Sequence, residues 1–112
     1  MKLLTTTLGS YLTGSDIADA VIDYGYALAQ ERRVDLIDIP ITVDHTTTRL
    51  RLTIGWQIQV HALGVSGDGV EMIDENTTAY LRARTAELTV ATMGGADGWD
   101  LGFDALADGP EL

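Results

Sequence analysis

The sequence contains no cysteine and is poor in basic residues. The absence of cysteine excludes disulfide bridges, thiolate metal sites and a cysteine nucleophile. Only 7 residues are Lys or Arg against 17 Asp or Glu, which gives a formal net charge of -10. Because proteins that bind nucleic-acid backbones neutralise phosphates with Lys and Arg, this balance argues against direct nucleic-acid binding.

Long apolar runs are also missing. No window approaches the roughly 18 apolar residues that a membrane span requires. Three threonines at positions 5–7 interrupt the short apolar run that follows Lys2, so the first residues lack the pattern of a signal peptide. We therefore expect a cytoplasmic protein that does not enter a membrane.

The composition is that of one globular domain. The 112 residues are 46% hydrophobic and 21% charged. A chain of this length commonly forms a single domain, which buries roughly 65% of its unfolded surface. We place this domain at residues 1–93 and treat residues 94–112 as a separate tail.

The clearest element is an amphipathic helix predicted over residues 16–31. Ser15 or Thr13 is placed to cap its first turn. One side of the helix is acidic and the opposite side is apolar, so the helix is expected to lie on a sheet. Gly25 lies on the apolar side of the helix, where glycine is less favourable for helix formation than alanine by roughly 1 kcal/mol. We expect it to permit close approach of the helix backbone to the sheet. The acidic residues are Asp16, Asp19 and Asp23.

Two segments alternate with the period of a strand. In residues 34–43, Pro40 cannot donate to a ladder, so this strand is an edge or is bulged or broken there. Residues 48–63 alternate over a length unusual for one strand, and Gly55 is expected to divide them into 48–54 and 56–63. Their polar side forms a candidate contact surface for a ligand or partner. It consists of Arg49, Arg51, Gln57, Gln59 and His61.

Further elements complete the prediction. Residues 2–8 and 11–12 read as short strands, 64–69 as a loop leading into a strand at 70–73, and 88–93 as a last strand. Asp74 is a good cap for a second, shorter helix at about 75–86. The expected fold is α+β in two layers, with a mostly antiparallel sheet of four or five strands and the long helix on one face.

The tail from residue 94 onward has acidic residues but no Lys or Arg, and it carries half of the net charge. Three apolar residues are spaced to share one helical face: Trp99, Phe103 and Leu106. One interpretation is a segment that folds against a partner, with these residues as contacts. The other is that the tail docks on its own domain.

No catalytic pattern is recognisable. His45 lies in a turn beside Asp44. Neither His45 nor His61 has a nucleophilic side chain at a spacing typical of catalytic sites. Neither histidine has a second potential metal ligand at the spacing that places both on one face of a helix. The glycine- and aspartate-rich residues 94–100 lack the ligand pattern of an EF-hand. We therefore expect no enzyme activity, no metal and no cofactor.

Three functional hypotheses follow from the sequence. The first is a small non-catalytic interaction module with an unknown protein partner or with itself, as a homodimer, through its sheet face or its tail. The second is an acidic protein whose carboxylates imitate DNA phosphates and occupy or inhibit a nucleic-acid-binding protein. The third is a small ligand-binding protein or enzyme centred on Arg49, Arg51 and His61, which requires a concave pocket.

Overall fold

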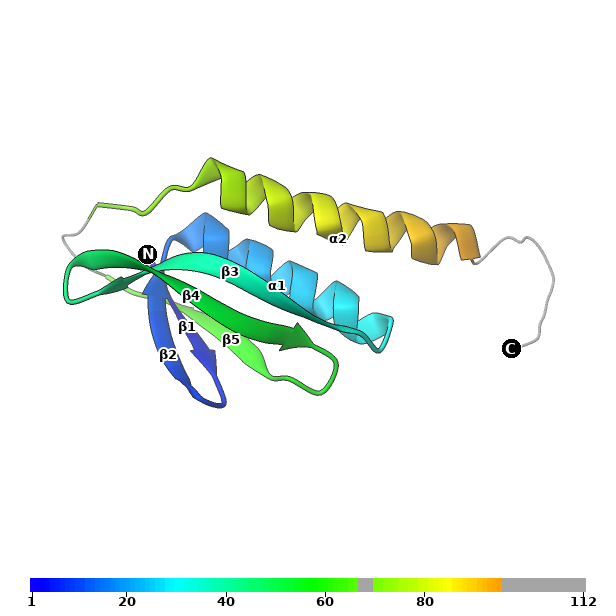
Figure 1. The fold of residues 1–112 in the computed structure, drawn as a ribbon, viewed down its shortest axis with the longest axis horizontal. Coiled ribbons are helices and arrows are strands. Elements are labelled where there is room, and N and C mark those ends of the chain that lie inside the picture. Colours follow the sequence, from blue (N-terminus) through cyan, green and yellow to red (C-terminus); the bar gives the residue numbers. More distant parts are fainter. Residues whose placement is uncertain (67–69, 96–112) are drawn as a thin grey trace.

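The computed structural model of the protein describes the backbone of residues 1–66 and 70–95 and the side chains of residues 1–66 and 70–89. These residues form five strands and two helices, which confirms the predicted α+β class (Figure 1). The elements in chain order are β1 (Lys2–Thr6), β2 (Gly9–Thr13), α1 (Ser15–Gln30), β3 (Val34–Val43), β4 (Thr46–Gly55), β5 (Val60–Gly64) and α2 (Glu75–Gly95).

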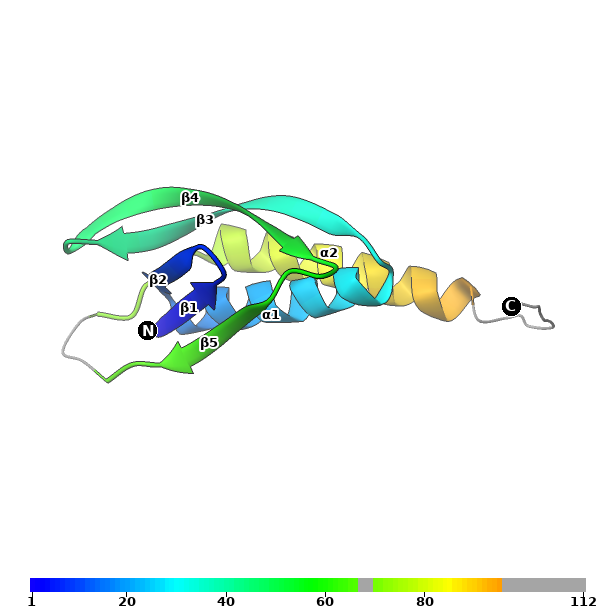
Figure 2. The ribbon, with the colours of Figure 1, turned by 90° about the horizontal axis from the view of Figure 1, so that it is seen from below.

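The described strands form one antiparallel sheet in the order β4-β3-β2-β1-β5. β1 pairs along its whole length with β2 on one side and β5 on the other, and β3 pairs along its whole length with β4. These two groups are joined weakly, because β2 and β3 share a single registered pair, Leu12 with Thr42. β4 and β5 are therefore the edges of the sheet, and Figure 2 shows α1 between them.

The alternating segment 48–63 is divided between the two edges. β4 ends at Gly55, where the break was predicted, but β5 begins at Val60 on the opposite side of the sheet. Gly55 has a φ of 125°, and the next N–H, that of Trp56, donates to the carbonyl of Arg33 at 2.9 Å. The chain turns away from β3 at this point, so the single polar strand face predicted over this segment does not exist.

β3 has a full partner on one side only. It forms a hairpin with β4 through Asp44 and His45, whose φ values of 51° and 63° are those of a type I′ turn. On the other side β3 is paired with β2 only at Thr42. Pro40 therefore needs no backbone N–H for a ladder hydrogen bond. The carbonyl of Pro40 instead accepts a hydrogen bond from the Thr13 hydroxyl at 2.7 Å. The prediction that Pro40 marks an edge strand is wrong, because β3 lies between β4 and β2 in the sheet; the proline is accommodated where pairing with β2 is absent.

Both helices lie on the same side of the sheet (Figures 1 and 2). α1 covers the strands directly, whereas α2 packs on α1. α2 extends to Gly95, so the strand predicted at 88–93 is wrong. The reason is helical spacing: Leu88 follows Leu81 by two turns, and both are buried against α1. The core between α1 and the sheet contains Leu4, Ile17, Val21, Tyr24, Leu28, Ile37, Ile39 and Ile54.

The beginning of α1 also differs from the prediction. Its N-cap is Gly14, which has no side chain to accept the free N–H groups of the first turn. Glu71 does so from the segment before α2, accepting the Ser15 N–H at 2.5 Å. This contact holds residues 70–74 across the start of α1, and the strand predicted at 70–73 is not formed. A carboxylate at the positive end of a helix is favoured by the helix dipole.

Candidate functional site

The structure separates the polar residues that the sequence grouped on one strand. Arg49 and Arg51 lie on β4, whereas His61 lies on β5 at the opposite edge of the sheet. Gln57 and Gln59 lie in the connection between these strands. Arg49 is paired with Asp38 at 2.7 Å, and Arg51 forms no ion pair with the described residues. Trp99, Phe103 and Leu106 lie outside the described residues.

A cleft of about 410 Å³ lies between α1 and the start of β5, and two of the predicted residues line it. We call it the α1–β5 cleft. One wall is α1 from its middle to its C-terminal end, with Val21, Ile22, Gly25, Tyr26 and Ala29. The other wall is the connection from β4 and the first residues of β5, with Gly55, Ile58, Gln59, Val60 and His61. The lining is mostly apolar, as is usual for a binding site.

The cleft continues toward the N-terminal half of α1 as a second, polar hollow of about 490 Å³. The two share Ile22, Val60 and His61. In the polar hollow the acidic side of α1 meets cations from other elements. Lys2 of β1 contacts Asp19 at 2.6 Å, and Arg82 of α2 contacts Asp23 at 3.4 Å. Two of the three helix carboxylates identified from the sequence are thus paired within the protein.

Gly25 faces the apolar part of this cleft. A Cβ at this position would lie 3.8 Å from the Cβ of Ile54, which is an ordinary van der Waals distance. The expectation that close packing on the sheet requires a glycine here is therefore wrong. What the missing side chain provides is open space in the wall of the cleft.

Replacement of Gly25 with alanine should therefore stabilise the protein. Alanine removes the helix-propensity cost without a clash, so the free energy of unfolding should rise by about 0.5–1 kcal/mol. Urea unfolding followed by circular dichroism measures the change. A lower free energy of unfolding in the Gly25→Ala variant would show that a methyl group does not fit at this site.

Exposed cations stand at the end of the molecule where the cleft begins. Arg32 and Arg33 follow Glu31, the C-cap of α1, and both are exposed. Arg32 lies over the ring of Trp56 at 5.3 Å from its centroid, a cation–π contact. Neither arginine forms an ion pair with the described residues, in a chain whose net charge is strongly negative. This end of the protein therefore combines an apolar cleft, an exposed indole and two arginines that have no ion pair within residues 1–66 and 70–89.

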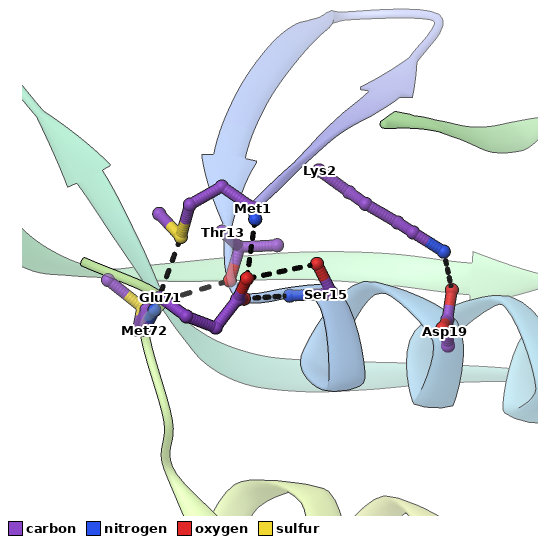
Figure 3. Close-up of polar contacts among 7 residues, drawn as sticks. All are labelled: Met1, Lys2, Thr13, Ser15, Asp19, Glu71 and Met72. Carbon is purple, nitrogen blue, oxygen red and sulfur yellow. Dashed lines mark hydrogen bonds and ion pairs between the residues drawn. The ribbon is translucent and has the colours of Figure 1, made fainter. Parts of the chain in front are cut away.

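A polar cluster holds the opposite end of α1 (Figure 3). The α-amino group of Met1 contacts Glu71 at 2.6 Å, and the Ser15 hydroxyl donates to the same carboxylate at 3.2 Å. Hydrogen bonds from the N-terminal amine and from the Ser15 N–H hold the pKa of Glu71 below its ordinary value. Every member has a partner in the fold, so this cluster is structural.

Tyr24 lies at the junction of α1, β3 and α2, and the pKa of its hydroxyl is raised. Its ring is fully buried, and its hydroxyl donates to Asp35 of β3 and accepts from Arg84 of α2 at 3.3 Å. Burial raises the pKa of the hydroxyl above 10.0, and the Asp35 hydrogen bond raises it further. The three side chains link α1, β3 and α2.

A Tyr24→Phe variant should lose about 1–2 kcal/mol of stability, because Asp35 loses a hydrogen-bond donor. Because the pKa of Tyr24 is raised in the folded state, its contribution to the free energy of unfolding is complete below pH 10. This contribution is lost as the pH rises above that value. Urea unfolding at about pH 8 and pH 11 should therefore show a smaller decrease for the variant than for the parent protein. Equal decreases would mean that Tyr24 does not couple folding to proton release.

The described residues do not provide a set of ligands for a metal ion. No group of three His, Asp or Glu side chains within them is arranged to hold a metal ion. Within the same residues, neither helix has the length and apolar composition of a bilayer-spanning helix. Comparisons of the chain with protein-family models, with curated proteins and with solved structures gave no match.

Proposed function

We propose that the protein is a small non-catalytic interaction module that binds an extended segment of another protein in the α1–β5 cleft. The observation that carries this proposal is the position of an apolar cleft beside the edge strand β5. An edge strand presents unpaired backbone N–H and C=O groups, and a partner segment can pair with them as an added strand.

The dimensions of the cleft and its polar continuation fit a short peptide. Along α1 they extend from Asp19 to Ala29, which is about 15 Å at the rise of an α-helix. About five residues of an extended chain span this length. Alternate side chains of such a segment face the cleft, so the ligand should carry apolar residues at every second position.

The other two hypotheses have less support. Imitation of DNA needs a continuous band of free carboxylates, whereas Asp19 and Asp23 are already paired with Lys2 and Arg82. A ligand site centred on both arginines and His61 needs these residues in one pocket, whereas β4 and β5 place them at opposite edges of the sheet.

Selection of peptides from a displayed library, with the full chain as bait, tests the proposal. The selected peptides are then titrated against two variants that each gain a leucine side chain. Gly25→Leu places a side chain in the cleft and should weaken binding about tenfold or more, which is about 1.4 kcal/mol. Ala83→Leu is the matched control, because it adds the same side chain at an exposed position of α2 that lines neither part of the cleft. If the selected peptides bind both variants equally well, the cleft is not the binding site.

The homodimer expected from the sequence is a second candidate, favoured by β4. This edge strand is ten residues long and contains no proline, and unprotected edges of this kind pair readily with a second chain. Light scattering coupled to gel filtration gives the mass in solution. A monomeric mass across the accessible concentration range would exclude the homodimer.

A further inference from the structure

We infer that the α1–β5 cleft is occupied by the protein's own C-terminal segment, residues 99–104, which adds to the free edge of β5 as a sixth strand. This inference rests on the proposed function, because it takes the same cleft as the binding site and names its resident ligand. The consequence is regulation: a partner segment has to displace the tail in order to bind.

The first argument is the position from which the tail starts. α2 ends at Gly95, beyond the end of α1 and at the same end of the molecule as the connection from β4 to β5 (Figures 1 and 2). The cleft lies on the β5 side of α1, and no residue of α2 lines its apolar part. The tail must cross the end of α1 to enter it. Packed elements lie about 10 Å apart, so the path is roughly 20 Å.

The available length is sufficient for this path. Residues 96–112 follow Gly95, and an extended chain spans about 3.4 Å per residue. The eight residues up to Phe103 therefore reach as far as about 27 Å. Leu101 and Phe103 can lie in the cleft, with Trp99 at its entrance near Trp56.

The second argument is the pattern of the segment. Apolar residues alternate with acidic residues or glycine from Trp99 to Asp104. This is the period of a strand with one apolar side, and β5 offers an edge of five residues. In an added strand the side chains of Leu101 and Phe103 face the cleft, where Gly25 leaves space, and the side chain of Asp104 faces solvent.

The third argument is charge complementarity. The route from α2 to the cleft passes Arg32 and Arg33, which have no ion pair among the described residues and follow Glu31, the C-cap of α1. The first acidic residues of the tail, Asp97 and Asp100, lie in the part of the chain that makes this crossing. Opposite charges at such a position favour the docked state and fix the direction of approach.

A spin label in the tail tests the inference in the full-length protein. Because the chain has no cysteine, an Ala107→Cys variant is labelled with nitroxide at one site only. We expect the label to broaden the NMR amide signals of Val60, His61 and Gly25, and to leave those of Asp44 and His45 at the far end of the β3–β4 hairpin sharp. A second variant, Leu101→Ser with Phe103→Ser, should restore the broadened signals, whereas the control Leu112→Ser should not.

Two results would overturn the inference. The first is the absence of broadening at the cleft, or broadening that persists in the Leu101→Ser, Phe103→Ser variant. The second is broadening in a mixture of spin-labelled chains with isotope-labelled chains that lack the spin label, which would show docking between copies. The proposed function is judged separately by the selected peptides. If Gly25→Leu weakens peptide binding while the spin label shows no tail in the cleft, only the inference on the tail fails.

Discussion

Replacing Gly55 with alanine is expected to destabilise the protein by about 3 kcal/mol or more. Two independent effects act at this position. The φ of 125° is strained for any residue with a side chain. A Cβ would also lie 2.3 Å from the carbonyl oxygen of Arg33, and this oxygen cannot move freely because it accepts the hydrogen bond of the Trp56 N–H.

Urea unfolding of the Gly55→Ala variant measures this effect, with Gly64→Ala as the matched control. Gly64 lies in a strand where a methyl group meets no other atom within 4 Å, so its replacement should change the free energy of unfolding by less than about 1 kcal/mol. Similar stabilities of the two variants would mean that the backbone at Gly55 relaxes and that its close approach to the Arg33 carbonyl is not required for stability.

Replacing Gly14 with alanine is expected to cost about 2–3 kcal/mol. Its φ of -65° and ψ of 150° are open to any residue, so the effect is due to contact alone. A Cβ would lie 2.0 Å from the carbonyl oxygen of Met72. Relief of this clash moves the segment that holds Glu71 against the first turn of α1, and the helix loses its cap.

A double-mutant cycle with Glu71→Gln checks this explanation. If Gly14→Ala acts by displacing Glu71 from Ser15, the loss of stability in the double variant should be smaller than the sum of the two single losses. Additive losses would show that the close contact of Gly14 with Met72 and the Glu71 cap are independent.

The sequence predicts local elements of this fold well, because their causes are local. The helix at 16–31 agrees with α1 to within one residue at each end, since a single apolar side along this segment defines it. The break at Gly55 is also where it was expected. In both cases the residues that determine the structure are neighbours along the chain.

Long-range contacts account for what the sequence does not reveal. Nothing in the alternation of residues 48–63 shows that β1 pairs with β5 and takes it to the other edge of the sheet. The cap of α1 comes from Glu71, 56 residues after Ser15. Gly14 at the N-cap is the one local sign of this, because it has no side chain to accept the free N–H groups of the first turn. The α1–β5 cleft was missed for the same reason, since its walls meet only in the folded chain, although Gln59 and His61 were identified as candidate contacts.

The order of the strands has a consequence for the folding reaction. The β3–β4 hairpin closes through a two-residue turn, whereas β5 pairs with β1 across about 60 residues of chain. Local contacts of the first kind form quickly, and distant pairings of the second kind carry the larger loop-closure entropy and form slowly. We therefore expect β5 to join the sheet last, so that the α1–β5 cleft forms in the final step of folding.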